Sequence, residues 1–386
     1  MRKGLNSNSI SQRHGAHGVH KERMIIFMLS LNTVSFVPRT EGSMRLRVKK
    51  FTIILFVLFF LGCNRENTQA AVTEQAEEVE YIAVAFEEID EEAPPAVHFV
   101  LSAPNARPGE HVTVGLRTLY DGRSFQALLF DSRDRRIARA TFFVLEVQEM
   151  NQILMAAVMA IPSTALVEEA IIRIESEGEI LGELPFTIDN REFHSETIEL
   201  GPSNTALRTT PDPRRTAESE QIWAIFNRTG REIHTLGPFI RPVTSTRRTS
   251  IYGSRRVFHY SDGSVSSPAV HAGVDYGVPT GTEVMASGAG RVVLARERII
   301  TGNSVILEHL PGVYSVYYHL DSINVSEGEI VEAGEILGLS GATGLATGPH
   351  LHWEIRVSGE NADPDAFLSQ PIIDKNELIY KLGTRD

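Results

Sequence analysis

The chain has one cysteine, Cys63, among its 386 residues, so no disulfide can form within it. Positive charge is also scarce: 37 lysines and arginines stand against 49 aspartates and glutamates, and the net charge is −12. No basic stripe interrupts this acidic balance. Nucleic-acid binding needs such a stripe to displace counterions from phosphates, so we expect no nucleic-acid partner.

Several catalytic motifs are missing as well. The chain has no His-Glu-x-x-His of thermolysin-like zinc sites and no Gly-x-Ser-x-Gly elbow, and its glycine run 341–348 lacks the Lys-Ser/Thr of a P-loop. Residues 325–334 resemble the hairpins of biotinyl and lipoyl carrier domains, but no lysine that could be modified occurs between Gly281 and Asp374. These absences exclude the carrier function and leave those hydrolase classes without support.

A short apolar run near the N-terminus predicts export. Residues 51–63 follow a cluster of basic residues, are almost all apolar, and end in Leu-Gly-Cys. Such a run is too short to span a bilayer comfortably and is typical of a secretory signal. We interpret 44–63 as a lipoprotein signal peptide that is cut before Cys63, whose thiol is then lipidated; the alternative is an uncleaved signal anchor. Because Met44 stands directly before the basic residues, we interpret 1–43 as a non-native upstream extension.

The next segments predict a tether and a β domain. Residues 64–95 are acidic and poor in structural signals, and like charges extend a chain, so we expect a tether. Residues 96–190 contain roughly seven short apolar, β-branched runs separated by turn signals, which is typical of an immunoglobulin-like antiparallel sandwich. We expect its His98 and His111 to be ordinary surface or strand-end residues.

The second half of the chain predicts another β domain. Residues 191–236 form a connection, with a helix near 216–228 whose apolar face packs on a neighbouring domain. Glycine-punctuated β runs fill 237–370, and 371–386 form a C-terminal tail. The expected fold is therefore mainly β, with a sandwich, a short helical connection and a C-terminal antiparallel domain.

Four histidines and one aspartate of the C-terminal domain can carry chemistry. His350 and His352 are separated by one residue, so on a strand they point the same way, with Cα atoms roughly 6.5 Å apart. His271 and Asp275 form a second closely spaced pair, and His319 lies between the two pairs in the sequence. Imidazole and carboxylate suit zinc, and a catalytic zinc keeps three protein ligands and one position for water. We therefore expect a hydrolytic zinc centre.

Two histidines and one aspartate as ligands would leave two imidazoles for other tasks. A neutral histidine can take the proton of the water and pass it to a leaving amine, and a second can hydrogen-bond the developing oxyanion. Spacing alone does not decide whether His350 or His352 binds the metal.

At these residues the sequence resembles the M23 family of zinc metallopeptidases, the LytM- or lysostaphin-type peptidoglycan endopeptidases. The resemblance spans roughly residues 237–368, about a third of the chain, and rests on separate motifs in the order of the family. These motifs are Ser250-Ile251-Tyr252-Gly253-Ser254-Arg255, His271 with Asp275, Pro279-Thr280-Gly281-Thr282-Glu283-Val284, Tyr318-His319-Leu320, Gly328 with Gly334, and the run from Thr343 to His352.

The resemblance implies a role for each of the five residues. His271, Asp275 and His352 would ligate one Zn²⁺, while His319 and His350 would act on the water and on the tetrahedral intermediate. Which of that pair is the principal base stays open. The resemblance also implies a compact antiparallel β fold with a long groove over the metal.

The chain departs from the family pattern in two loops. Residues 256–270 form a longer loop, and Leu310-Pro311-Gly312 replaces a tighter glycine turn. We expect both changes to affect substrate preference and to leave the five functional positions intact. His259 and His309 are expected to be surface or structural histidines, because the ligand set is complete without them.

Strand alternation also makes predictions for the residues after His352. Glu354 falls on the same strand face as His350 and His352, and we favour an ordinary rim carboxylate over a partner that supports the ligands. Trp353 should face the opposite side, into a core.

The predicted function is a zinc endopeptidase that cuts peptide bonds in the cross-links or stem peptides of peptidoglycan. Lipid on Cys63 would anchor it in the cell envelope, facing the periplasm or the wall. The alternative is a non-catalytic scaffold or an activator of other cell-wall hydrolases, but such proteins lose ligands and this chain keeps all of them. A regulatory envelope protein is left open as a further partner.

Overall fold

The structure is a computed structural model. It describes residues 24–38, 44–58, 97–119, 122–148, 152–228 and 230–383. The chain divides into two compact units, Met1–Glu87 and Glu88–Asp386. Among the residues in these ranges, no helix is both long and apolar enough to cross a membrane.

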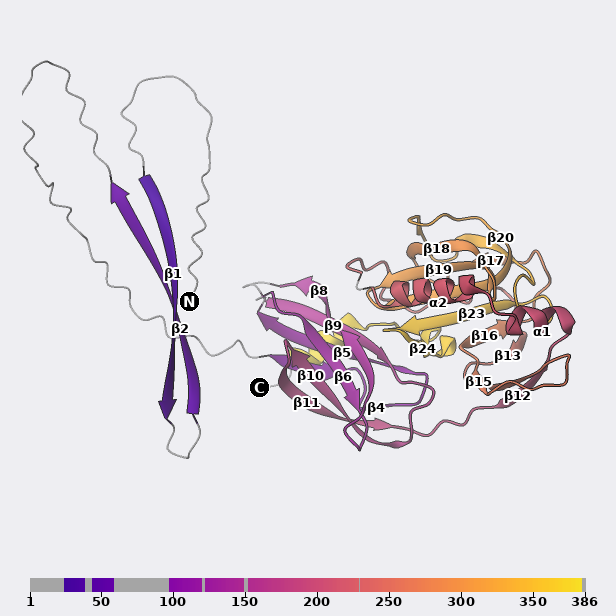
Figure 1. Cartoon of the computed structure of the whole chain (residues 1–386), viewed down its shortest axis with the longest axis horizontal. Helices are drawn as coiled ribbons and strands as arrows, with labels where there is room; N and C mark the ends of the chain where they lie inside the picture. The colour runs from indigo at the N-terminus through magenta and orange to yellow at the C-terminus, as the bar shows by residue number, and fades with distance from the viewer. Residues whose placement is uncertain are drawn as a thin grey trace, which may run out of the picture. The chain divides into compact units, whose positions relative to one another are not determined.

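The first unit contains an antiparallel pair of strands, β1 (Met24–Pro38) and β2 (Met44–Leu58) (Figure 1). The backbone of β2 covers most of the predicted signal peptide. Cys63 and the predicted tether 64–95 lie outside the described residues.

The N-terminal part of the second unit is a β-sandwich, as predicted (Figure 1). Its strands are β3 (His98–Leu101), β4 (Asn105–Ala106), β5 (His111–Leu119), β6 (Phe125–Phe130), β7 (Arg136–Thr141), β8 (Phe143–Val147), β9 (Gln152–Ala160), β10 (Glu168–Ser176) and β11 (Glu179–Ile188). One sheet has the order β3-β5-β9-β8 and the other β4-β11-β10-β6-β7. Alternate residues of both sheets, among them Leu116, Leu129 and Ile172, bury a common core.

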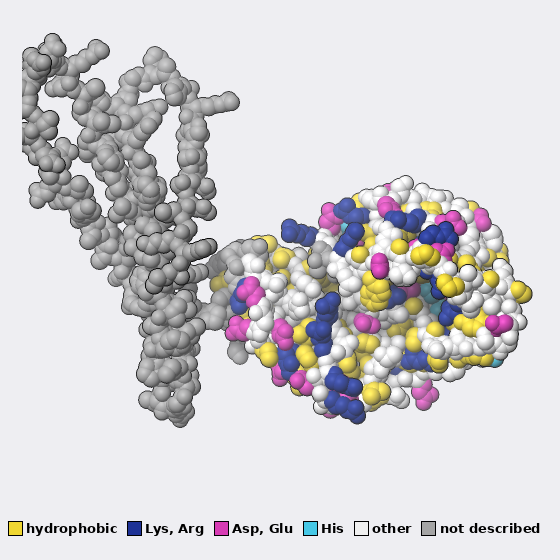
Figure 2. All heavy atoms as spheres, viewed as in Figure 1, with side chains coloured by type: hydrophobic (Ala, Val, Ile, Leu, Met, Phe, Trp, Pro, Cys, Tyr) yellow, Lys and Arg dark blue, Asp and Glu magenta, His cyan; other side chains and the backbone are white. Residues whose placement is uncertain are grey.

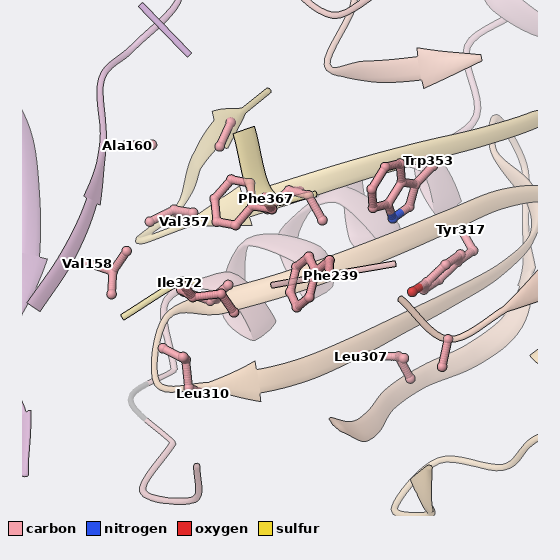
Figure 3. Packing of buried hydrophobic residues seen from close by; sticks show 14 of the residues in the cluster. Val158, Ala160, Phe239, Leu307, Leu310, Tyr317, Trp353, Val357, Phe367 and Ile372 are labelled. Atoms are coloured by element: carbon pink, nitrogen blue, oxygen red, sulfur yellow. The ribbon is translucent and has the colours of Figure 1, made fainter. Parts of the chain in front are cut away.

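Strand β9 is buried on both faces. Met155 and Met159 face the sandwich core, whereas Val158 and Ala160 belong to the core of the C-terminal domain. Figure 3 shows these two side chains facing Val357 and its neighbours. A strand at the surface would alternate apolar and polar residues, so the continuous apolar run of β9 reflects a core that the two domains share.

The C-terminal domain is built around a ten-stranded sheet with the order β13-β16-β23-β20-β19-β18-β21, to which β17, β22 and β24 are joined. The bounds of these strands are β13 (Arg248–Ser250), β16 (Gly273–Tyr276), β17 (Glu283–Met285), β18 (Gly290–Arg298), β19 (Gly302–Leu310), β20 (Val313–Ile323), β21 (Ile330–Val331), β22 (Ile336–Ser340), β23 (Leu351–Val357) and β24 (Glu360–Ala362). A short 3-10 helix, Pro364–Phe367, follows β24. Tyr276, Tyr317 and Trp353 are fully buried in the core of this domain, Trp353 as predicted.

The connection between the domains contains β12 (Ser195–Glu199), α1 (Pro202–Thr209) and α2 (Pro213–Phe226). The predicted helix corresponds to α2, which begins earlier than expected because Asp212 caps it, accepting a hydrogen bond from the Arg214 N–H at 2.9 Å. The apolar residues at its C-terminal end pack on the C-terminal domain. The connection therefore belongs structurally to that domain.

Strand β12 was not predicted. It pairs in parallel with β14 (Arg255–His259), which in turn pairs with β15 (Ala269–Val270). The longer loop 256–270 thus forms part of a small separate sheet whose third strand comes from the connection.

The predicted C-terminal tail forms a helix, α3 (Lys375–Gly383), which contacts β3 and β5 of the sandwich. Leu378 and Leu382 are buried in the shared core. The chain therefore returns from the C-terminal domain to the sandwich, which ties the two domains together a second time.

His309 makes the stability of the second unit depend on pH. Its ring is fully buried, with Nδ1 2.8 Å from the Ala289 carbonyl oxygen and Nε2 2.7 Å from Ser315 Oγ. Burial lowers the pKa of His309 from 6.5 to about 4. The unfolded chain therefore takes up this proton at a higher pH than the folded chain does. The contribution of the neutral ring to the unfolding free energy is complete above pH 6.5 and decreases as the pH falls towards 4. Because one pKa unit corresponds to about 1.4 kcal/mol, the decrease is roughly 3 kcal/mol.

We expect His309→Gln to flatten the dependence of the unfolding free energy on pH between 6.5 and 4, as measured by urea denaturation. His98→Gln, which changes an exposed histidine of β3, should leave the slope as it is. An unchanged slope in His309→Gln would contradict this assignment.

Candidate metal centre

Three neighbouring strands bring the predicted site residues together. The antiparallel pairing of β16 with β23 places Asp275 opposite His352, and the pairing of β20 with β23 places Tyr318 opposite His352 on the other side. His271 lies just before β16, and His350 just before β23. Since directly paired residues have Cβ atoms about 5 Å apart, strand register brings the side chains of Asp275, Tyr318 and His352 together.

Three ligand atoms converge in this cluster. His271 Nε2 lies 3.1 Å from Asp275 Oδ1 and 3.1 Å from His352 Nδ1. Asp275 Oδ1 and His352 Nδ1 are 2.8 Å apart. All three residues are buried, and together they can hold a metal ion. Donor atoms placed tetrahedrally around zinc at about 2.0–2.2 Å lie roughly 3.3 Å from one another. The residues present therefore fit a zinc ion closely.

The hydrogen bonds of the ring nitrogens agree with this arrangement. His271 Nδ1 donates to the Ile251 carbonyl oxygen at 2.8 Å, and His352 Nε2 donates to Glu354 Oε2 at 3.3 Å. Because both acceptors are oxygens that cannot donate, these nitrogens carry the hydrogens. In the neutral rings, His271 Nε2 and His352 Nδ1 are then the unprotonated atoms, as metal ligation requires.

The charges of the cluster also favour a cation. Burial alone would raise the pKa of Asp275, but hydrogen bonds from His271 and His352 hold it well below its ordinary value, so the carboxylate is ionised. Burial opposes the charged form of His352, yet Asp275 and Glu354 outweigh it and raise the pKa of His352 to about 9. Since only neutral imidazole ligates a metal, binding of a metal ion through His352 would release a proton.

His350 and His319 lie beside the three converging residues His271, Asp275 and His352. His350 Nδ1 donates to the Gly348 carbonyl oxygen at 2.8 Å, and its Nε2 lies 3.8 Å from Asp275 Oδ1. His319 Nδ1 donates to the Thr343 carbonyl oxygen at 2.8 Å, and its ring centroid is 4.8 Å from that of His350. Each neutral ring therefore keeps an unprotonated Nε2 that can accept a proton.

The backbone of His319 adopts a conformation that is rare for a residue with a side chain. Its φ is +63°, at a point where the register of β20 is irregular, and its N–H donates to the Thr301 carbonyl oxygen at 2.9 Å. Such left-handed backbone costs roughly 1–3 kcal/mol and is concentrated at functional sites. Burial, with His350 and His352 nearby, lowers the pKa of His319 to about 3, so this imidazole is neutral at ordinary pH.

Our expectation for Glu354 was wrong. It is 2% exposed rather than a rim carboxylate, and besides His352 it contacts Arg356, whose Nε donates to Oε1. Burial would raise the pKa of Glu354, but Arg356 and His352 lower it to about 2. Strand alternation correctly placed Glu354 on the ligand face. Strand alternation could not predict that Arg356 is the counter-ion that allows the charge of Glu354 to be buried.

The cluster lines a cleft of about 360 Å³. The same cleft is lined by Glu196, Arg256 and Phe258 and by the loop that contains Leu345 and Thr347. Asn204 of α1 donates to the Ala346 carbonyl oxygen at 2.8 Å, so the connection also touches this loop. Figure 2 shows histidine side chains inside a hollow of this part of the surface.

A second cleft, of about 880 Å³, shares residues with the first. Both are lined by Arg208, Ile300, Thr301 and Tyr318, and the second continues along α2 to Glu354 and Arg356. The ring of Tyr318 also stacks on His352, with centroids 5.5 Å apart and planes 8° from parallel. Tyr318 belongs to the Tyr318-His319-Leu320 motif of the sequence, but its contact with His352 follows only from the strand register.

An antiparallel β domain with a buried His-Asp-His group beside two further histidines defines the class of the domain as a metal-dependent hydrolase. Comparison with known proteins gives its family. Residues 269–364 match the description of Peptidase family M23. The C-terminal domain of the chain therefore belongs to peptidase family M23, in agreement with the resemblance of its sequence motifs.

Relatives with assigned names share this domain. The DD-carboxypeptidase/endopeptidase Mpg of Neisseria meningitidis serogroup B is 36% identical over 138 residues, which are 35% of this chain and 30% of that protein. The peptidoglycan DD-endopeptidase ShyA of Vibrio cholerae is 45% identical over 119 residues, 30% of this chain and 28% of that protein. The chain thus matches less than a third of the length of these relatives.

A solved structure described as a peptidase M23 from Pseudomonas aeruginosa is also similar to the chain. The two are 24% identical, and the match covers 70% of this chain and 96% of that one, with a TM-score of 0.46.

We predict that Asp275→Ala abolishes stoichiometric zinc binding, because it removes the only carboxylate among the three converging ligand residues. The measurement is the zinc content of purified protein after dialysis against a weak chelator. Asp131→Ala, which changes a buried aspartate of the sandwich, should keep its zinc. Full zinc occupancy in Asp275→Ala would show that the ion binds elsewhere.

Proposed function

We propose that the protein is a zinc-dependent endopeptidase that hydrolyses peptide bonds in the cross-links or stem peptides of peptidoglycan. The observation that carries the proposal is the convergence of His271 Nε2, Asp275 Oδ1 and His352 Nδ1, with His319 and His350 beside them. The substrate class is supported by the names of the relatives, several of which are called peptidoglycan DD-endopeptidases.

In this proposal the five residues divide into two groups. His271, Asp275 and His352 would hold the zinc ion, which would lower the pKa of water and polarise a peptide carbonyl. In their neutral forms His350 and His319 each present an unprotonated Nε2, so in this proposal either can accept the proton of the attacking water. The imidazolium that forms can hydrogen-bond the developing oxyanion and then protonates the leaving amine, which balances the proton.

The clefts give room for an extended peptide. The cleft over His271, Asp275 and His352 shares Arg208 and Tyr318 with the larger cleft along α2, and in this proposal the two clefts together hold a substrate longer than one dipeptide. The scaffold or activator role has no observation in its favour, because all five positions keep the residue types that catalysis needs.

We expect His350→Ala to lose hydrolysis of purified peptidoglycan, by about 100-fold or more, while keeping zinc, because it removes a proton acceptor and no ligand. Zinc content and the muropeptide products are measured on the same preparation. His98→Ala, on an exposed strand end of the sandwich, should behave as the unchanged protein does. If the zinc-loaded unchanged protein released no peptide between about pH 5 and 9, an activator role would replace catalysis.

We also propose that lipid on Cys63 anchors the protein in the cell envelope. The support is the apolar run that ends at the only cysteine of the chain. Each buried CH₂ of an acyl chain contributes about 0.8 kcal/mol to membrane binding, so two or three chains hold a protein of this size firmly.

Cys63→Ser should therefore abolish incorporation of labelled palmitate and move the protein out of the washed membrane fraction. Ser102→Ala, a change of similar size in the sandwich, serves as a control that should alter neither result. Cys63→Ser protein that takes up no label and still sediments with membranes would contradict lipid anchoring through Cys63.

A further inference from the structure

We propose that Glu196 and Arg256 are positioning residues for the metal centre, and that strand β12 of the connection thereby helps to set its geometry. Neither residue lies in the segment that matches the peptidase family. The inference deepens the proposed function and rests on His271, Asp275 and His352 as the ligand set.

Arg256 fixes the orientation of the Asp275 carboxylate. Its Nη2 donates to Asp275 Oδ2 at 2.7 Å, while Oδ1 is the oxygen that faces His271 and His352. The guanidinium thus hydrogen-bonds the carboxylate oxygen that is turned away from the two histidines. A charge-assisted hydrogen bond of this kind keeps the carboxylate from rotating and leaves one oxygen for a metal ion.

Glu196 in turn holds Arg256. Its Oε2 accepts from Arg256 Nε at 3.1 Å, and its two oxygens lie 2.6 and 2.8 Å from Ser250 Oγ. Ser250 Oγ is also 3.3 Å from His271 Nδ1. Glu196 therefore supports two of the three ligand residues indirectly. It contacts Arg256, which binds Asp275, and Ser250, which lies next to His271.

Strand register places Glu196 next to Arg256, just as it places Asp275 next to His352. In the parallel pairing of β12 with β14, Glu196 is the partner of Arg256. Their side chains are 23% and 17% exposed, so the ion pair is shielded enough from water to hold its geometry. The longer loop supplies one member of the pair and the connection supplies the other.

Charge gives Glu196 a second effect. Arg256 alone would place a positive charge beside a carboxylate that is meant to bind a dication, which would weaken metal binding. Glu196 neutralises that charge and leaves the orienting hydrogen bond in place. The pair can therefore align Asp275 without making the site more positive.

The test is zinc affinity of the full chain, measured by competition with a chromophoric chelator. We expect Arg256→Gln to bind zinc about 10- to 100-fold more weakly, the usual effect of removing a residue that supports a metal ligand. If the guanidinium acted only through its charge, the same change would strengthen binding. Glu196→Gln should also weaken zinc binding. The loss of zinc affinity in the double variant should not exceed the product of the two single losses, and it should be smaller if the two residues act as one unit.

Glu199→Gln is the matched control, because Glu199 lies on the same strand and its side chain is 75% exposed. It should bind zinc as the unchanged protein does, and thermal unfolding of every variant shows whether the fold is kept. Zinc affinity in Arg256→Gln that is unchanged or higher, with the fold kept, would overturn the inference. Asp275→Ala separates the two proposals: if it loses zinc while Arg256→Gln does not, only the positioning role fails, and if it keeps zinc, the ligand set itself is wrong.

Discussion

The antiparallel pairing of β16 with β23 is the constraint on which the site depends. It sets Asp275 directly opposite His352, and the next pairing sets Tyr318 against the other side of the same histidine. A shift of one residue would turn these side chains to the opposite face of the sheet. The fully buried Trp353, whose side chain points away from the ligands, opposes such a shift because it would have to leave the core.

Neighbouring elements of the second unit pack around that pairing. The C-terminal domain shares its core with strand β9 and helix α3, so the sandwich is packed against it rather than carried on a free linker. On the other side, α2 covers the sheet and β12 completes the small sheet next to Asp275. The ligand residues therefore sit in a domain that is braced from both directions, which suits a site whose geometry must be fixed before substrate binds.

Much of the fold and the positions of the site residues could be predicted from the sequence. Short β-branched runs predicted the first β domain and glycine-punctuated β runs the second. The order of motifs pointed to five site residues that the structure brings together, namely His271, Asp275, His319, His350 and His352. The double burial of β9 was visible in principle as an unbroken apolar run. Glu354 and the Glu196–Arg256 pair were out of reach, because a buried charge depends on partners that only folding supplies, and the latter two residues are 60 positions apart.

The most direct test of this account is the position of zinc in crystals of the zinc-loaded protein, located by anomalous scattering at the zinc edge. The account predicts one strong peak about 2.0–2.2 Å from His271 Nε2, Asp275 Oδ1 and His352 Nδ1, with His319 and His350 close by but not bound to it. A peak ligated by His350 in place of His352, or no peak among these residues, would contradict the division between ligands and proton-transfer groups.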